Sequence, residues 1–138
     1  MLDIRYAEPE DLSWLHEHDR DVSSEWAERC ITHREYIIAL DEGQKTGFLR
    51  FSLFWGAIPY MDLIRVNEGL QRQGIGTALF KFWEKEMIAK GAKTLLTSSV
   101  HDEIEPQAWH KQNGFGECGQ LTFGEYQSTP EIFFVKNL

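Results

Sequence analysis

Short apolar runs separated by turn residues recur along the chain, and this pattern predicts a set of β-strands. Residues 2–7 alternate apolar and polar side chains, as in a strand with one buried face. Residues 36–40 and 47–54 flank the turn Asp41–Gln44, so we expect them to form a hairpin. Further strands are predicted at residues 60–66, 94–100, 115–123 and 132–135.

Helical spacing of apolar residues marks the segments between these strands. The longest predicted helix covers residues 74–90, where apolar side chains recur every four residues before Gly91 ends it. Shorter helices are predicted from Pro9, from Ser23 to Cys30, and from Pro106 to Gly114. Strands and helices in this order indicate a mixed α/β fold, and the length of 138 residues favours one domain over residues 1–138.

The composition narrows the class of function. Apolar residues make up 42% of the chain, which is ample for a hydrophobic core. The formal net charge of −8 argues against a nucleic-acid-binding protein, which would usually need a basic face. The acidic balance fits either a cationic substrate or solubility alone. No run approaches the roughly 20 apolar residues of a membrane span, and charged residues near Met1 replace the apolar region of a signal peptide. We therefore expect a cytoplasmic protein.

The two cysteines, Cys30 and Cys118, lie far apart and fit no metal-ligand spacing. In a reducing compartment we expect both to be buried free thiols. A polar cluster at residues 101–105 is expected to be solvated, so no metal site is predicted.

The segment between the strand ending at Val66 and the long helix contains Gly74 and Gly76. A helix N-terminus offers unpaired N–H groups and a positive dipole end, and glycine lets an anion approach the backbone closely. The segment is therefore a candidate phosphate site. It lacks the third glycine of the dinucleotide fingerprint and the Gly-Lys-Ser/Thr of a P-loop. The alternative is an ordinary glycine-containing loop.

Three motifs in chain order resemble the GNAT family of N-acetyltransferases. Val66 is followed after four residues by Gln71-Arg72-Gln73-Gly74-Ile75-Gly76, which is similar to the family's Gln/Arg-x-x-Gly-x-Gly/Ala pattern at the same spacing. The opening Ile4-Arg5-x-Ala7-x-x-x-Asp11 resembles the family's first strand and helix. Residues 108–115 resemble its late helix, which ends in Gly-Phe.

The resemblance implies a mixed, mostly antiparallel sheet of six or seven strands flanked by helices, with two central parallel strands splayed apart. It also implies an enzyme that moves an acetyl group from acetyl-CoA to a primary amine by direct attack in a ternary complex. The amine would belong to a small molecule or a peptide. The residues implied to bind acetyl-CoA are Ile64, Arg65 and Val66 for pantetheine, and Gln71, Arg72, Gln73, Gly74, Ile75, Gly76 and Thr77 for the pyrophosphate.

Proton transfer needs an acid near the CoA sulfur and a base near the amine. The family's usual Tyr on the late helix is replaced here by His110, which is the candidate acid; the alternatives are a packing role beside Trp109, or Tyr126 as the acid. Asp62 is the candidate base because a carboxylate within an interior strand favours a polar cleft. Its alternative is a solvent-accessible strand position. Glu103 replaces an Asn that the family often has before this helix.

Trp26 and Trp55 are the candidates for the acceptor site, because the family builds that site from early helices and from the loop before the cofactor strand. Hydrophobic packing is the alternative for each. Two other functions stay open for the chain. One is an acyl-CoA-binding or sensing module without catalysis, and the other is an interaction domain that forms a homodimer through surface near Trp55 or the last strand.

Overall fold

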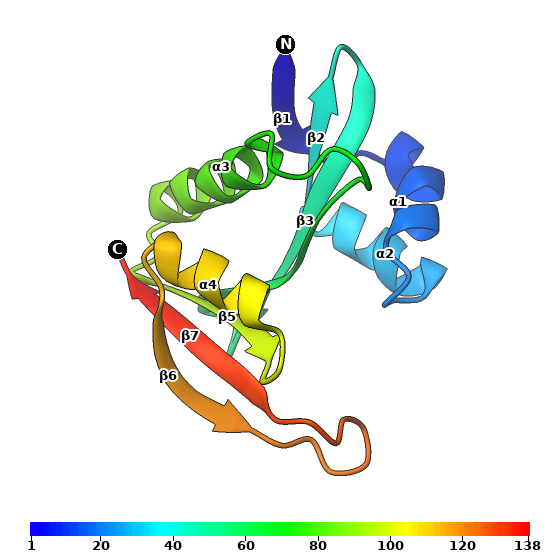
Figure 1. The fold of residues 1–138 in the computed structure, drawn as a ribbon. Helices are drawn as coiled ribbons and strands as arrows, with labels where there is room; N and C mark the ends of the chain where they lie inside the picture. The colour runs from blue at the N-terminus through cyan, green and yellow to red at the C-terminus, as the bar shows by residue number, and fades with distance from the viewer. The chain divides into compact units, whose positions relative to one another are not determined.

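Seven strands form one sheet in the order β1-β2-β3-β4-β5-β7-β6 (Figure 1). The β1–β2, β2–β3, β5–β7 and β6–β7 pairs are antiparallel, whereas β4 and β5 are parallel. This confirms the mixed, mostly antiparallel sheet. The computed structural model describes all residues 1–138. The elements are β1 Leu2–Tyr6, η1 Pro9–Asp11, α1 Leu12–His18, α2 Ser24–Thr32, β2 Tyr36–Asp41, β3 Gln44–Phe54, β4 Ile58–Val66, α3 Ile75–Ala89, β5 Thr94–Val100, α4 Ile104–Gln112, β6 Gly116–Leu121 and β7 Glu131–Asn137.

The chain forms two compact units, residues 1–51 with 63–86, and residues 52–62 with 87–138. The boundaries fall inside β3, β4 and α3, so each of these elements contributes to both units. The single domain over residues 1–138 stays a prediction. None of the helices is long and apolar enough to cross a membrane.

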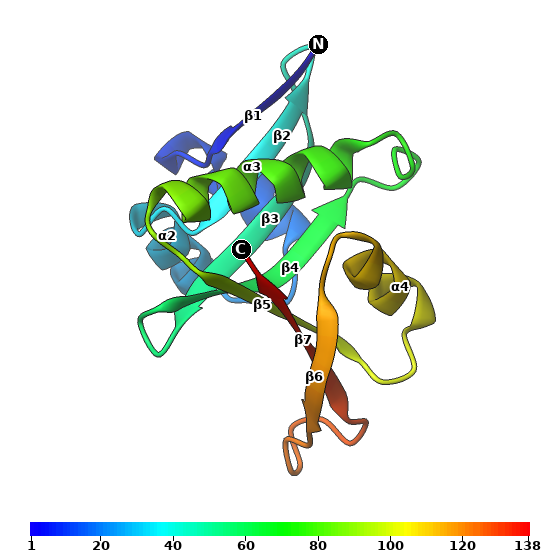
Figure 2. The ribbon, with the colours of Figure 1, turned by 90° about the vertical axis from the view of Figure 1, so that its left-hand side faces the viewer.

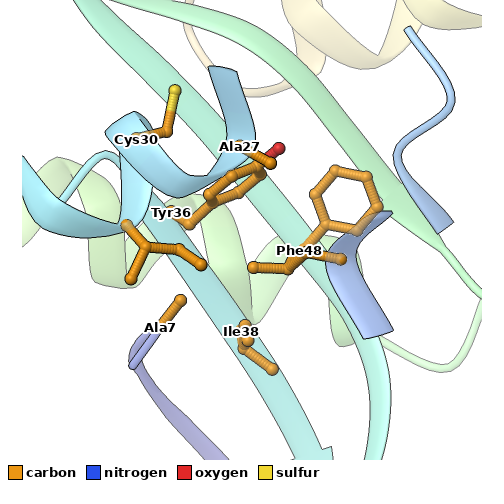
Figure 3. Close-up of a cluster of buried hydrophobic side chains, with 8 residues drawn as sticks. Ala7, Ala27, Cys30, Tyr36, Ile38 and Phe48 are labelled. Atoms are coloured by element: carbon orange, nitrogen blue, oxygen red, sulfur yellow. The ribbon is translucent and has the colours of Figure 1, made fainter. Parts of the chain in front are cut away.

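In the first unit, α1 and α2 cover one face of the β2–β3 hairpin and α3 covers the other (Figures 1 and 2). Strand alternation explains this arrangement, because successive side chains point to opposite faces. On the α3 side, the rings of Phe51 and Trp83 lie 5.9 Å apart. The core on the α1–α2 side is drawn in Figure 3 and consists of Ala7, Leu15, Ala27, Cys30, Ile31, Tyr36, Ile38 and Phe48.

The predicted helix starts agree closely with the structure in this unit. Ser23 is the N-cap of α2, and its hydroxyl accepts a hydrogen bond from the backbone N–H of Trp26 at 3.1 Å. Asp11 precedes α1 and is buried. Burial raises the pKa of Asp11, but hydrogen bonds from the Arg5 guanidinium and the Glu8 backbone N–H outweigh burial and leave that pKa below its ordinary value.

A buried ion pair closes the segment between α1 and α2. The Nε of Arg50 donates to Oδ2 of Asp19 at 2.7 Å, and the hydroxyl of Tyr36 donates to the same oxygen at 2.6 Å. Asp19 is only 1% exposed. Burial and the neighbouring Asp19 carboxylate both raise the pKa of Tyr36. Side chains from β2 and β3 therefore compensate the buried charge of Asp19. These contacts hold the segment between α1 and α2 against the two strands.

The second unit is built on β5, which pairs in parallel with the start of β4 and antiparallel with β7. Helix α4 begins at Ile104, two residues before the predicted start at Pro106. β6 pairs only with β7 at the end of the sheet, and all six of its residues are exposed. Cys118 on this strand is therefore an exposed free thiol, so the expectation of burial is wrong for it, whereas Cys30 is a buried free thiol as expected.

Candidate functional site

The loop between β4 and α3 has a defined shape. Three of its residues have positive φ: Gly69 at 85°, Arg72 at 66° and Gly74 at 83°. The side chain of Gln71 bridges the loop, since its Oε1 accepts from the N–H of Gly69 at 3.0 Å and its Nε2 donates to the carbonyl of Val66 at 3.3 Å. The loop is thus held by its own side chain and backbone.

The backbone N–H groups of Ile75, Gly76 and Thr77 lie in the first turn of α3, where N–H groups have no partner within the helix. The backbone hydrogen bond from Ala78 to the carbonyl of Gly74, at 3.0 Å, lies at the start of α3. A Cβ at Gly74 would meet nothing within 4 Å, so glycine is required there by the positive φ and not by crowding. Unpaired N–H groups at the positive end of a 15-residue helix form a site for an anion such as a phosphate.

The end of β4, which carries this loop, is held closely against β3. A Cβ on Gly47 would lie 2.8 Å from the carbonyl oxygen of Arg65. The N–H of Asn67 donates to the carbonyl of Thr46 at 2.8 Å, and its side-chain amide donates to the carbonyl of Lys45 at 3.1 Å. The last residues of β4 therefore have a fixed position within the first unit. This segment contains Ile64, Arg65 and Val66.

Asp62 is half-buried on β4 and belongs to the second unit. Its Oδ1 accepts a hydrogen bond from the hydroxyl of Ser52 on β3 at 2.8 Å. A carboxylate that accepts a hydrogen bond can also accept a proton from a nearby amine. The role of Asp62 as a base stays a prediction.

His110 lies in the core of the second unit and is 4% exposed. Its Nε2 is 2.8 Å from the hydroxyl oxygen of Ser99 on β5, and its ring contacts Phe115 and Phe134 at centroid distances of 6.0 and 5.4 Å. Burial lowers the pKa of His110 to about 4, so the imidazole is neutral at pH 7. These contacts favour the packing alternative, and the role of His110 as an acid stays a prediction.

The two candidate acceptor residues belong to different units. Trp26 lies in the first turn of α2 and is 44% exposed, with the guanidinium carbon of Arg29 4.6 Å from its ring centroid. Trp55 lies in the turn between β3 and β4, has a positive φ of 57° and is 85% exposed, with its ring against Phe54. Their place in an acceptor site stays a prediction.

A chain of polar side chains in the second unit was not predicted as a site. The hydroxyls of Tyr60 and Ser98 are 2.6 Å apart, and Ser98 donates to Oε2 of Glu131 at 2.6 Å. The side-chain amide of Gln127 donates to Oε1 of Glu131 at 3.0 Å. Strand alternation places Tyr60 on a face with Asp62, but Glu131 reaches Ser98 only through the pairing of β5 with β7, and local sequence patterns do not reveal that pairing.

An apolar groove of about 500 Å³ lies beside this polar chain. Most of its lining consists of aromatic and aliphatic side chains. They come from the strands β3 to β7 and from the loop between β6 and β7. No group of three or more His, Cys, Asp or Glu side chains is arranged to hold a metal ion. The side chains that line the groove are mainly Phe54, Tyr60, Leu96, Leu121, Phe123 and Phe133.

Comparison with known proteins gives the family. Residues 2–115 match the model of the acetyltransferase (GNAT) family. The chain belongs to this family. As a GNAT acetyltransferase it has the family's parallel β4–β5 pair and the glycine turn before α3 in the expected order. No curated protein matches the chain in sequence.

Solved structures of GNAT proteins share the fold. A ribosomal-protein-alanine N-acetyltransferase from Brucella melitensis has a TM-score of 0.83 at 22% identity, covering 99% of each chain. A GNAT acetyltransferase from Bacillus cereus has a TM-score of 0.81 at 21% identity, covering 99% of this chain and 97% of the other. The putative acetyltransferase yncA from Salmonella typhimurium, solved with its cofactor acetyl-CoA, has a TM-score of 0.79 at 19% identity, covering 99% and 94%.

Proposed function

We propose that this GNAT protein transfers an acetyl group from acetyl-CoA to a primary amine by direct attack in a ternary complex. The observation that carries the proposal is the glycine turn Gln71–Gly74, which leads directly into the N–H groups of the first turn of α3. Membership of the acetyltransferase family supports it. A cytoplasmic location is part of the same proposal.

The donor half of the proposal rests on main-chain groups. The pyrophosphate of acetyl-CoA would accept hydrogen bonds from the turn Gln71–Thr77, which Gln71 holds in shape. The pantetheine would pair with the main chain of Ile64–Val66, which the β3 contacts hold in place. Backbone donors explain how a protein with a net charge of −8 can bind an anionic cofactor.

The chemistry requires a neutral amine and a leaving thiolate. The amine nitrogen attacks the thioester carbonyl carbon, the carbon–sulfur bond breaks, and the amine releases a proton. Asp62, which is positioned by Ser52, is the proposed acceptor of that proton. His110 is neutral, so its proposed part is to act as a hydrogen-bonding group beside the thiolate and not as an imidazolium acid.

The acceptor belongs to a small molecule or a peptide. One structural neighbour is a ribosomal-protein-S18-alanine N-acetyltransferase from Escherichia coli, and another is NAA60 of Arabidopsis thaliana in complex with a bisubstrate analogue. At 18% and 16% identity these neighbours support only the fold. The proposal therefore includes both small-molecule amines and peptide amines.

A second candidate function is an acyl-CoA-binding module without catalysis. The burial and low pKa of His110, at the place of the family's usual Tyr, favour this alternative. The two functions differ in one measurable property, the release of free thiol from acetyl-CoA in the presence of amines. Release that depends on an added amine supports the enzyme, and binding of acetyl-CoA without release across an amine panel supports the module.

The phosphate site is tested by Gly74→Val. A β-branched residue at a φ of +83° forces the turn to change, so we expect acetyl-CoA affinity in calorimetry to fall at least tenfold. Gly43→Val is the matched control, because Gly43 has a φ of +79° and equally open surroundings in the β2–β3 turn. The control should bind acetyl-CoA like the wild type. Unchanged affinity in Gly74→Val contradicts the assignment.

A further inference from the structure

The groove in the second unit has an aromatic floor. The rings of Tyr60 on β4 and Phe133 on β7 are stacked, with centroids 6.1 Å apart and an interplanar angle of 26°. Leu96 on β5 is paired with Tyr60 in the parallel register and lies between the two strands. The exposed side chains of Phe54 and Leu121 also line the groove. Apolar side chains grouped this way at a surface mark a binding site.

A carboxylate lies at one end of this groove. A smaller cavity of about 230 Å³ adjoins the groove, because both are lined by Tyr60 and Phe123. Glu131 and Gln127 line the smaller cavity. Ser98 and Gln127 each donate one hydrogen bond to Glu131, which fixes its orientation. Each carboxylate oxygen has a further lone pair, so Glu131 can accept from a cation.

We propose that this groove binds the acceptor of the transfer reaction, and that the acceptor is a small primary amine with an aromatic body. The aromatic body lies on Tyr60 and Phe133, and Glu131 binds the nitrogen as the incoming ammonium. The ammonium must lose a proton before the neutral amine attacks the thioester. This inference rests on the proposed acetyltransferase function and adds the class of substrate to it.

Size, shape and charge select this occupant. A volume of about 500 Å³ suits a small molecule, and the stacked floor suits a flat ring. Glu131 supplies one negative charge at one end only, which matches an amine with a single ammonium. Tyr60 lies four residues before Ile64 on β4, so the groove contains a residue of the strand proposed to pair with pantetheine.

The test uses 2-phenylethylamine as the probe, with two ligands that each lack one feature. Ethanolamine keeps the ammonium and loses the ring, whereas 2-phenylethanol keeps the ring and loses the charge. Binding is measured by ligand-observed NMR with CoA present. We expect 2-phenylethylamine to bind at least tenfold more tightly than either analogue. A charge-assisted hydrogen bond and a buried ring are each of that order.

Two variants locate the bound probe. Leu121→Gln should weaken binding of 2-phenylethylamine about fivefold because it removes apolar surface from the groove. Ile88→Gln is its matched control, since Ile88 is 53% exposed and Leu121 54%, and Ile88 is outside the groove. Glu131→Gln should weaken binding of 2-phenylethylamine about tenfold and leave 2-phenylethanol unchanged. Glu117→Gln removes a charge from an exposed position on the same hairpin and should change neither.

Four results would overturn the inference. The first is equal binding of ethanolamine and 2-phenylethylamine, and the second is equal effects of Leu121→Gln and Ile88→Gln on binding. The third is tenfold tighter binding of a peptide that begins with phenylalanine than of 2-phenylethylamine, which would make the acceptor a peptide. The fourth is a dimer in light scattering that Leu121→Gln alone disperses, which would assign the groove to a second copy of the chain.

The two proposals fail in different ways. Probe binding in the groove without acetyl transfer to any amine refutes the enzyme, and the groove then remains only a binding site for an aromatic amine. Transfer to polar amines without probe binding refutes the groove assignment and leaves the enzyme standing. Absence of both binding and transfer refutes both.

Discussion

His110 shows how one residue acquires its properties from contacts between distant segments. Helical spacing predicts that residue 110 lies on a helix, and α4 confirms this. Its burial results from Ser99 on β5 and Phe134 on β7, which the chain brings to the same face of the sheet. A family pattern identifies the position, but only these contacts show that the imidazole is desolvated and neutral.

Removal of this imidazole should flatten the pH dependence of stability. The folded pKa near 4 lies below the ordinary value of 6.5, so the unfolded state binds more protons between these values. The free energy of unfolding therefore falls as the pH is lowered through this window. Between pH 7 and pH 5 the wild type should lose about 2 kcal/mol that His110→Gln does not lose. Urea denaturation at both pH values measures this, and equal losses in the two proteins would contradict it.

Asp19 is a second residue whose role depends on distant partners. Asp19→Ala removes the acceptor of Arg50 Nε and of the Tyr36 hydroxyl inside the core, so we expect a loss of about 3 kcal/mol or more in the free energy of unfolding. Asp21→Ala is the control. Asp21 is 3.9 Å from Arg65 and exposed, so its loss should change stability by less than about 0.5 kcal/mol. Similar losses in the two variants, measured by urea denaturation, would argue against a buried ion pair.

At the scale of elements, local patterns predicted most of the sheet and all four α-helices. Apolar runs, caps and glycines are properties of neighbouring residues, so they reveal strands, the N-cap at Ser23 and the turn before α3. Pairing between strands distant in sequence is not such a property. The acidic group Glu131 and the groove depend on β7 lying beside β5, and for that reason they were missed.

The approach of β3 to β4 gives a prediction at this scale. Gly47→Ala places a Cβ 2.8 Å from the carbonyl oxygen of Arg65, so the two strands must move apart, and we expect a loss of about 1–3 kcal/mol in the free energy of unfolding. Gly116→Ala on β6 is the control, because its Cβ meets nothing within 4 Å. The control should be neutral or slightly more stable. Chemical denaturation of both variants tests this, and equal stability of the two would contradict the close contact.

At the scale of the whole molecule, acetyl-CoA should stabilise the folded chain by mass action. At about 100 times its dissociation constant the ligand should raise the free energy of unfolding by about 2.7 kcal/mol, which thermal or chemical unfolding detects. The Gly74→Val variant should show a smaller gain at the same concentration. No gain in the wild type at saturating acetyl-CoA would refute both the enzyme and the acyl-CoA-binding module.

The turn before α3 presents its main chain to the proposed ligand, and this affects how mutations would be interpreted. The N–H groups from Arg72 to Thr77 remain whatever non-proline side chains the positions carry. An alanine scan of the exposed side chains at Arg72 and Gln73 would therefore report tolerance at the very positions proposed to hold the cofactor. Sensitivity would instead be expected at the residues that set the backbone path, which include Gly69, Gln71 and Gly74.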